Sequence, residues 1–339
     1  MTLTHDPLMA ECPFVGYPTG WFIAAWSQEI GPGEIQPRRY FGTDLVVWRS
    51  DSGRAVVMDA HCAHMGCNLA HGATGRPHEN GLVVGDSVQC PFHGWRWDTD
   101  GRNVEIPGCD RTSRVRMRTW PTREVHDRLI LVWHDALGRP PLWEPPGIAE
   151  LDDPRRWYLA TEDCAWRRIS DLRLPNVMLL ENSVDPAHVK FVHGSEIGRG
   201  EILTADGPVF RSRIDLTYRA RDGRSFSNGG IGVELWGMGL IVTRLSGIHD
   251  IIQVVGITPT DGWNVDARVL NVARRDPKQE HPSPEARAVI DHQLYAIDED
   301  ASIFAHTRYR ARPPFLPDER EDFRVVRRWI GQFYPPVEC

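Results

Sequence analysis

The chain has 339 residues, of which 41% are hydrophobic and 25% are charged. A chain of this length usually forms about two domains, and this composition is ordinary for a globular protein that buries a core. The formal net charge is −7, and the sequence contains no run of basic residues. Nucleic acids and anionic membrane surfaces are therefore not expected as partners.

Cysteine usage and the lack of long apolar stretches indicate the compartment. The seven cysteines are scattered and odd in number, which argues against a disulfide framework and favours a reducing environment. The first residues lack the charged start and apolar core of a signal peptide. No apolar stretch reaches the roughly 20 residues that a transmembrane helix needs. We therefore expect a cytoplasmic protein without a membrane span.

Four segments are expected along the chain. Residues 1–19 are predicted to form an N-terminal arm, because prolines and glycines interrupt them. Residues 20–137 contain short apolar runs between turn residues, which predict an all-β domain. Residues 138–155 are rich in proline and are interpreted as a linker. Residues 156–339, which mix strand-like runs with at least two helices, are expected to form the second domain.

Two helices are predicted in the second domain. Ser283 followed by Pro284 is a good helix start, because serine caps a helix and proline suits its first position. Apolar residues then recur at steps of three and four and form one stripe. The stripe consists of Ala286, Ile290, Leu294, Ile297, Ala301 and Phe304. A further helix is expected over residues 324–333.

Two short motifs each combine a cysteine with a histidine, Cys62 with His64 and Cys90 with His93. Mixed zinc sites usually pair cysteine with cysteine and histidine with histidine. One of each in both motifs instead suits a Rieske [2Fe–2S] cluster, in which two thiolates bind one iron and two imidazoles bind the other. A zinc ion, or buried side chains without any metal, are the alternatives.

With the Gly-Trp-Arg-Trp sequence at residues 94–97, these motifs resemble the Rieske domain of oxygenases. The spacer of 25 residues, 65–89, is longer than is usual in that family, and its extra residues around 75–82 are expected to form a surface loop. Respiratory Rieske proteins cross-link a cysteine at the place of Cys67 to a second one. Phe92 stands at the matching place here, so the resemblance is to the lower-potential type, and Cys67 is interpreted as a small buried residue.

A second motif, Asp185-x2-His188-x4-His193, resembles the catalytic-domain signature of the same oxygenases. Asp185 and His188 share a helical face, whereas His193 can join them only near the end of the helix, where Gly194 lets the chain turn. The resemblance implies that His188 and His193 bind a mononuclear Fe(II). Two imidazoles and one carboxylate on one face of Fe(II) leave positions for O2 and substrate.

The third iron ligand is expected further along the chain. Asp300 matches the family's late Asp-x-x-Ile-aromatic pattern, and Asp298 is the alternative. A solvated acidic face over residues 298–300 is the other interpretation.

The resemblance also gives Asp185 a role as a bridging carboxylate. In the family this residue links an iron histidine of one subunit to a cluster histidine of its neighbour. Here it would join His188 to His93 of a second copy. This implies a ring of subunits, most simply a homotrimer.

The resemblance covers nearly the whole chain and implies an α+β fold. An N-terminal all-β Rieske domain would precede a helix-grip catalytic domain, an antiparallel sheet closed by a long helix. The motifs that carry it lie at residues 20–21, 41–48, 119–122, 131–135 and 327–334, which resemble 3-ketosteroid 9α-hydroxylase oxygenases. The first domain is also similar to cholesterol 7-desaturases and aminopyrrolnitrin oxygenases.

The resemblance implies a terminal oxygenase that uses O2 and electrons to hydroxylate, desaturate or demethylate a small hydrophobic, steroid-like or natural-product substrate. A flavin and iron–sulfur reductase, or a ferredoxin with its reductase, would supply the electrons. An arylamine N-oxygenase and a Rieske electron carrier without oxygenase activity are the alternatives. Within residues 229–241, Trp236, Met238 and Leu240 could line the cavity, but ordinary sheet core is the favoured interpretation.

Overall fold

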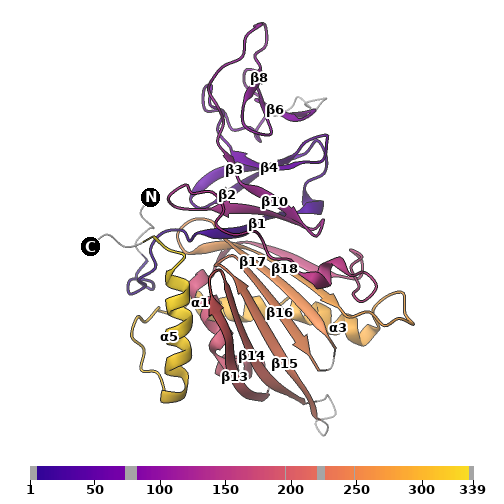
Figure 1. Ribbon diagram of the computed structural model, residues 1–339, viewed down its shortest axis with the longest axis vertical. Coiled ribbons are helices and arrows are strands. Elements are labelled where there is room, and N and C mark those ends of the chain that lie inside the picture. The colour runs from indigo at the N-terminus through magenta and orange to yellow at the C-terminus, as the bar shows by residue number, and fades with distance from the viewer. Residues whose placement is uncertain (1–5, 73–81, 195, 220–225, 248, 336–339) are drawn as a thin grey trace. The chain divides into compact units, whose positions relative to one another are not determined.

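The computed structural model describes residues 6–72, 82–194, 196–219, 226–247 and 249–335 (Figure 1). They divide into two units. The N-terminal unit comprises Phe22–His134 with Pro140–Pro145, and the C-terminal unit comprises the residues up to Trp21, Asp135–Arg139 and the chain from Pro146 onward. Apart from Leu82, the insertion expected around 75–82 lies outside the described residues.

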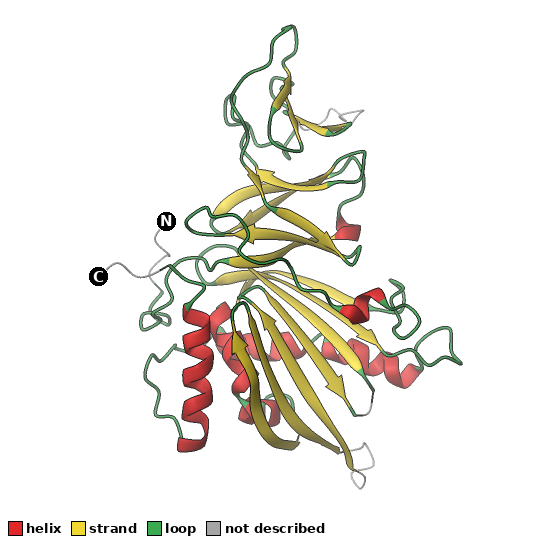
Figure 2. Cartoon of the chain, in the orientation of Figure 1, coloured by secondary structure: helices red, strands yellow, loops and turns green. Residues whose placement is uncertain are grey.

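The N-terminal unit is built from short antiparallel strands, as the alternation of apolar runs and turns predicts (Figure 2). Its described strands pair in the orders β1-β11-β10, β2-β3-β4-β9 and β5-β6-β7-β8. The strands are β1 (Gly20–Trp26), β2 (Ile35–Tyr40), β3 (Thr43–Arg49), β4 (Ala55–Asp59), β5 (Val83–Val84), β6 (Ser87–Gln89), β7 (Arg96–Asp98), β8 (Asn103–Glu105), β9 (Thr119–Trp120), β10 (Thr122–Val125) and β11 (Leu129–His134). The predicted all-β fold is confirmed.

The C-terminal unit is organised around one antiparallel sheet, in which seven strands of the described chain pair in the order β12-β18-β17-β16-β15-β14-β13. From β13 to β18 each strand pairs with the next strand in the chain. The strands are β12 (Ala165–Arg173), β13 (Glu196–Asp206), β14 (Val209–Arg219), β15 (Phe226–Trp236), β16 (Leu240–Ser246), β17 (Ile251–Pro259) and β18 (Asn264–Ala273).

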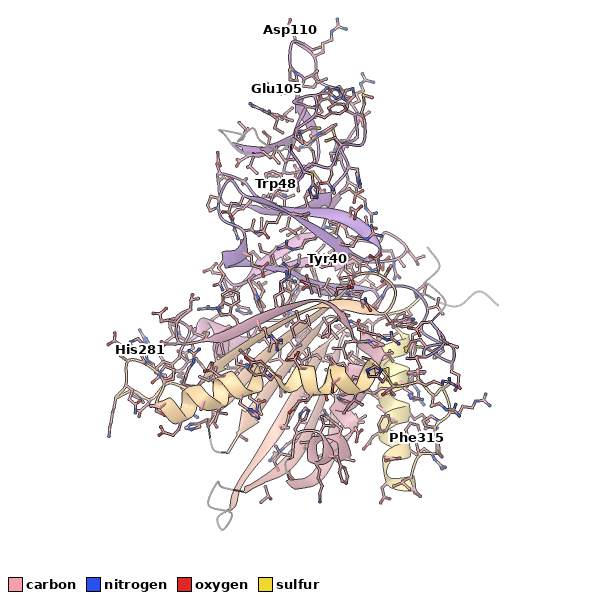
Figure 3. The ribbon with its side chains drawn as sticks, turned by 180° about the vertical axis from the view of Figure 1, so that it is seen from behind. Tyr40, Trp48, Glu105, Asp110, His281 and Phe315 are labelled. Atoms are coloured by element: carbon pink, nitrogen blue, oxygen red, sulfur yellow. The ribbon has the colours of Figure 1, made fainter. Side chains whose placement is uncertain are left out.

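Helices cover this sheet and give the expected helix-grip arrangement. Figure 3 shows α3 and α4 running across one face of the sheet. The helices are α1 (Asn176–Glu181), α2 (Pro186–Phe191), α3 (Pro284–Gln293), α4 (Ala296–Phe304) and α5 (Pro317–Gly331). Among the helices of the described residues, none combines the length and the apolar character needed to cross a lipid bilayer.

The predicted start of α3 is confirmed, because the Ser283 hydroxyl accepts a hydrogen bond from the Ala286 amide at 3.2 Å. The apolar stripe, however, belongs to two helices, since a turn at residues 294–295 separates α3 from α4. The stripe cannot reveal this break, because the apolar residues keep their spacing through the turn.

Helix α5 begins earlier than the expected residue 324. Pro317 occupies its first turn, and the Glu319 carboxylate accepts a hydrogen bond from the Leu316 amide at 2.8 Å. The expected start rested on apolar periodicity, which the polar first turns lack, and the start signals of Pro317 and Glu319 were missed.

The described part of the segment before residue 20 belongs to the C-terminal unit. Met9, Cys12 and Phe14 are buried, and the Leu8 carbonyl accepts a hydrogen bond from the Tyr309 amide at 2.8 Å. These contacts join residues that are far apart in the chain, which explains why local periodicity predicts only an arm.

A buried ion pair joins α1 to α5. Arg327 donates from Nε and Nη2 to both carboxylate oxygens of Glu181, at 2.9 and 3.0 Å, and the Tyr309 hydroxyl donates to the same carboxylate at 3.3 Å. Burial raises the pKa of Glu181, which Arg327 opposes. The carboxylate therefore depends on Arg327 to remain charged inside the protein.

Replacement of Arg327 by alanine is expected to lower the free energy of unfolding by about 3–5 kcal/mol, because it leaves a buried carboxylate without its partner. Arg324→Ala is the matched control, since Arg324 lies on the same helix but pairs with Glu321 at the surface, and its expected cost is about 0.5 kcal/mol or less. The measurement is urea unfolding followed by circular dichroism. Equal losses in the two variants would contradict the structural role of the pair.

Candidate metal centres

Two loops of the N-terminal unit carry the cysteine and histidine motifs, and they share one backbone pattern. The Cys62 carbonyl accepts from the Gly66 amide at 2.8 Å, and the Cys90 carbonyl accepts from the Gly94 amide at 3.0 Å. Both glycines have positive φ, 75° and 73°. At Gly94 a Cβ would also lie 2.8 Å from Cγ of Pro107, so a larger residue does not fit.

The two loops bring the four predicted cluster residues together as two pairs. Cys62 and Cys90 are each only 2% exposed, and their thiols are hydrogen-bonded to one another. This contact lowers the pKa of Cys90 to about 7 and raises that of Cys62. The rings of His64 and His93 lie with centroids 5.0 Å apart, and both residues are exposed. The thiols thus point into the core and the imidazoles lie at the surface.

This arrangement suits a two-iron cluster better than one zinc ion. A tetrahedral zinc site holds its ligand atoms about 3.3–3.8 Å apart. Among the described residues, no three of Cys62, His64, Cys90 and His93 bring their ligand atoms within 4.8 Å of one another. The same core also contains the indole of Trp97, whose Nε1 faces the Cys62 thiol and is placed to donate to a sulfur acceptor.

The second motif lies at α2 of the C-terminal unit. Asp185 is the N-cap of this helix, because its carboxylate accepts a hydrogen bond from the His188 amide at 3.2 Å. The His188 ring bonds through Nδ1 to the backbone carbonyl of Asp185, not to the carboxylate. Nε2 of His188 is thereby left to face a metal.

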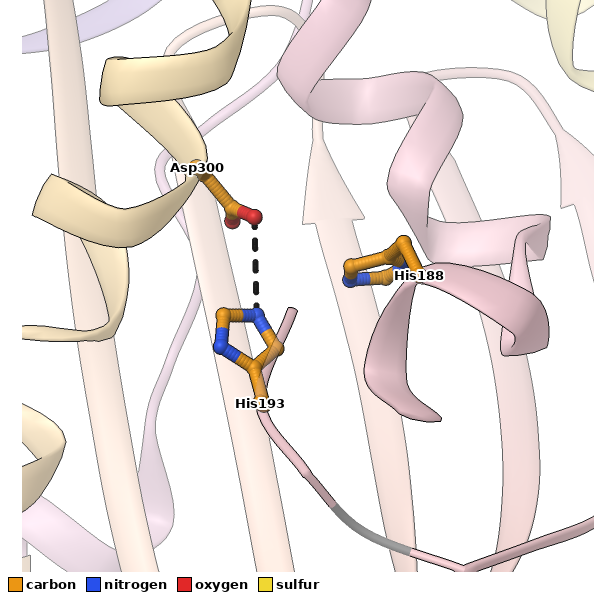
Figure 4. Close-up of side chains that lie close together, drawn as sticks. All are labelled: His188, His193 and Asp300. Carbon is orange, nitrogen blue, oxygen red and sulfur yellow. Dashed lines mark ion pairs between the residues drawn. The ribbon is translucent and has the colours of Figure 1, made fainter. Parts of the chain in front are cut away.

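His193 follows the end of α2, where the positive φ of Gly194, 69°, lets the chain turn as the motif predicts. Asp300, only 8% exposed, reaches the same point from α4. The ligand atoms of His188, His193 and Asp300 lie within 4.8 Å of one another, and Asp300 Oδ1 is 3.5 Å from His193 Nε2 (Figure 4). Two imidazoles and a carboxylate therefore converge.

The three consecutive acidic residues of α4, Asp298, Glu299 and Asp300, each make a different contact. Asp298, the alternative ligand, is paired with Arg167 and is not part of the converging group. The carboxylate oxygen Oε2 of Glu299 accepts a hydrogen bond from Nδ1 of His193 at 2.8 Å. Sequence reasoning missed Glu299, because only the fold places it beside a histidine 106 residues away.

Electrostatics differ between the two histidines. Burial lowers the pKa of His188, which favours the neutral imidazole that binds metals. Burial also opposes protonation of His193, but the carboxylates of Asp300 and Glu299 together raise its pKa.

A cavity of approximately 350 Å³ opens beside the converging side chains. Strand residues of alternating position form its apolar wall, namely Ile214, Leu216, Ile231, Val233, Leu235, Ile241, Leu245 and Val255. Trp236, Met238 and Leu240 are not among the lining residues, and Met238 and Leu240 are buried, in agreement with the favoured sheet-core interpretation. Asn182, which the sequence did not single out, lines the cavity with a buried Nδ2 that has no partner among the described residues.

Comparison with known proteins places this geometry in a family. Residues 20–121 match the model of the Rieske [2Fe-2S] domain, and residues 132–334 match that of the 3-Ketosteroid 9alpha-hydroxylase C-terminal domain. A 3-ketosteroid-9-alpha-monooxygenase oxygenase component from Mycobacterium tuberculosis is 34% identical, over 95% of this chain and 83% of its own. The chain belongs to the 3-ketosteroid 9α-hydroxylase family of Rieske oxygenases.

Other relatives extend the range of chemistry. The cholesterol 7-desaturase nvd of Bombyx mori is 27% identical to this Rieske oxygenase, over 94% of this chain and 70% of its own. Among solved structures, apo dicamba monooxygenase has a TM-score of 0.68 at 19% identity and covers 92% of this chain and 95% of its own, which supports the fold. The protein is thus the terminal oxygenase component of a Rieske monooxygenase, and such a component receives its electrons from a partner.

Glu299→Gln is expected to lower the affinity of the His188, His193 and Asp300 group for a divalent metal about 10–100-fold, because a neutral amide holds and polarises the His193 ring less well. Asp298→Asn is the control, since Asp298 pairs with Arg167 instead. Anaerobic titration of the metal-depleted protein with Co²⁺ measures both. Unchanged affinity in Glu299→Gln would show that the carboxylate does not support the ligand.

Proposed function

We propose that this oxygenase hydroxylates a hydrophobic, steroid-like molecule in the cavity of its C-terminal unit. In this proposal Cys62, His64, Cys90 and His93 hold the [2Fe–2S] cluster. His188, His193 and Asp300 hold a mononuclear iron. The single observation that carries the proposal is the convergence of these three side chains at the wall of an apolar cavity.

The donor sets fit the two groups. Two buried thiols beside two exposed imidazoles match the ligands of a Rieske cluster, and two imidazoles with one carboxylate match a site for Fe(II). When bound, the mononuclear iron supplies the open positions at which O2 and substrate react. The protein's own part is to orient His188 through the Asp185 carbonyl and to surround the site with apolar side chains that exclude water.

Hydroxylation is preferred to the alternatives. Residues 132–334 match the 3-Ketosteroid 9alpha-hydroxylase C-terminal domain. Two relatives named as 3-ketosteroid monooxygenase components are 33% and 34% identical over 94% and 95% of this chain, whereas the cholesterol 7-desaturase nvd of Xenopus laevis, at 33%, matches over only 60% of it. A Rieske electron carrier would not require a second group of metal-binding side chains. An arylamine N-oxygenase stays an alternative without a specific observation in its favour.

The oxygenase is further proposed to act as a homotrimer in the cytoplasm, with a flavin and iron–sulfur reductase or a ferredoxin as its electron donor. Large apolar side chains are exposed at the cluster loops, Met65 at 66% and Phe92 at 60%, and at the end of α2, Phe191 at 84%. Such residues favour a protein partner. The six cysteines of the described residues are free, which suits a reducing compartment.

Asp300→Ala is expected to abolish turnover and to lower the iron content from about three to about two per chain, while the cluster spectrum stays unchanged. Substrate-dependent O2 consumption with a surrogate reductase, tested across steroids, sterols, terpenoids and arylamines, measures the activity. Asp298→Ala is the matched control and should keep the iron. If Asp298→Ala were inactive and Asp300→Ala active, the assignment of the third ligand would be wrong.

Asp185→Asn tests the proposed bridge between subunits. Asparagine caps a helix about as well as aspartate and keeps the backbone carbonyl that orients the His188 ring, so α2 and its iron should persist. The amide lacks the negative charge with which the Asp185 side chain would accept a hydrogen bond from His93 of a neighbouring copy. We expect the cluster to remain reducible and the iron to remain bound, while product forms at least about tenfold more slowly. Single-turnover cluster reoxidation with substrate and O2 is the measurement. Reoxidation at the parent's rate would remove the bridging role.

A further inference from the structure

The polar side chains of the cavity form two separate groups. One group comes from outside the sheet and consists of the residues around the proposed iron site together with His292 and Gln293 at the end of α3. The other lies on the sheet, where Thr243 of β16 and Gln253 of β17 stand in a wall that is otherwise apolar. A polar pair in an apolar wall is costly unless it meets a hydrogen-bonding partner, so this pair requires an explanation.

The register of the strands makes the two residues neighbours. Thr243 is the direct cross-strand partner of Gln253, and Val233 of β15 is the partner of Thr243 on the other side. Partners in an antiparallel pair point to the same face, with Cβ atoms about 4.5–5.5 Å apart. The hydroxyl and the carboxamide therefore face the cavity together.

Hydrogen bonding fixes the orientation of the carboxamide. Gln253 Nε2 donates to the Gln293 carbonyl at 2.8 Å, in the last turn of α3. The reverse orientation would place two oxygens against each other, so Oε1 is the atom that remains for a ligand. Within the described chain, neither Gln253 Oε1 nor the Thr243 hydroxyl has a hydrogen-bond partner. The pair thus offers one acceptor and one hydroxyl that can donate.

The positions of the two polar sites on α3 and α4 indicate the shape of a ligand that contacts both. Gln293, which holds Gln253, and the proposed iron ligand Asp300 are seven residues apart in the chain. Gln293 ends α3, whereas Asp300 lies in α4 beyond the turn at residues 294–295, so the two polar sites occupy different places along the cavity. A molecule that reaches both the sheet pair and the iron site must therefore be elongated, and the wall between them requires it to be apolar.

We propose that Thr243 and Gln253 bind a hydroxyl group at the end of the substrate remote from the oxidised carbon. A hydroxyl can donate a hydrogen bond to Gln253 Oε1 and accept one from the Thr243 hydroxyl. A ketone can only accept from Thr243, which leaves Gln253 Oε1 without a donor. The substrate class is accordingly a fused-ring or similarly elongated apolar alcohol. This inference rests on the proposed function, because it takes the proposed iron site as the other end of the cavity.

The test compares three probes that differ only at one carbon, 5α-androstan-3β-ol, 5α-androstan-3-one and 5α-androstane. Equilibrium dialysis against the holoenzyme gives the Kd of each. The parent is expected to bind the alcohol most tightly and the hydrocarbon most weakly. Thr243→Val keeps the shape of the side chain. It should raise the Kd of the alcohol and of the ketone about fivefold and leave the Kd of the hydrocarbon unchanged.

Two further variants separate recognition from packing. Thr243→Ser keeps the hydroxyl and should retain the preference for the alcohol. Thr217→Val makes the same exchange in β14 outside the cavity lining and should change no affinity. Equal weakening of all three probes by Thr243→Val, equal binding of alcohol and hydrocarbon by the parent, or binding of none of them would overturn the inference. None of these outcomes affects the iron content of Asp300→Ala, so the proposed function is judged separately.

Discussion

The C-terminal unit depends on one constraint, the convergence of side chains that are distant in the chain. His193 and Glu299 are hydrogen-bonded across a separation of 106 residues. Strands β13 to β18 follow one another across the sheet. Helix α2, which precedes β13, therefore contacts the strand at one edge, whereas α3, which follows β18, contacts a strand near the other edge. The histidines and Asp300 can therefore meet only where helices from both sides extend over the same face. Correct pairing of every strand in between is required for the site to form.

The same constraint explains why the cavity is apolar. The helices and the residues at their ends supply the candidate metal-binding side chains, and the sheet beneath them contributes mostly apolar residues. In such surroundings burial lowers the pKa of His188, which favours the neutral imidazole that a metal requires. The carboxylates of Asp300 and Glu299 raise the pKa of His193, so a proton competes more strongly with a metal for this ring. Metal binding there should therefore weaken as the pH falls.

The parts of the protein that could be predicted from sequence are those encoded locally. Both cluster loops are short, and the α2 motif spans only residues 185–193, so spacing and residue type were enough to find them. Four residues of the candidate site and the cavity wall could not be predicted, because their placement depends on strand register and on helix contacts far along the chain. They are Glu299, Asn182, Thr243 and Gln253. The break between α3 and α4 was missed for a related reason, since an apolar stripe records which side faces the sheet but not whether the backbone turns.

The two candidate metal centres also differ in what they leave at the surface. The two loops bury both thiols and expose both imidazoles, so a cluster held by these four residues would present its histidine side to the surface. Phe92 lies next to His93 in the same loop, with ring centroids 3.8 Å apart, and is 60% exposed. Water contact at this apolar edge is unfavourable, and covering it with protein would bring an acceptor close to the imidazoles. These observations support the proposed working form, in which another protein surface covers the histidine edge.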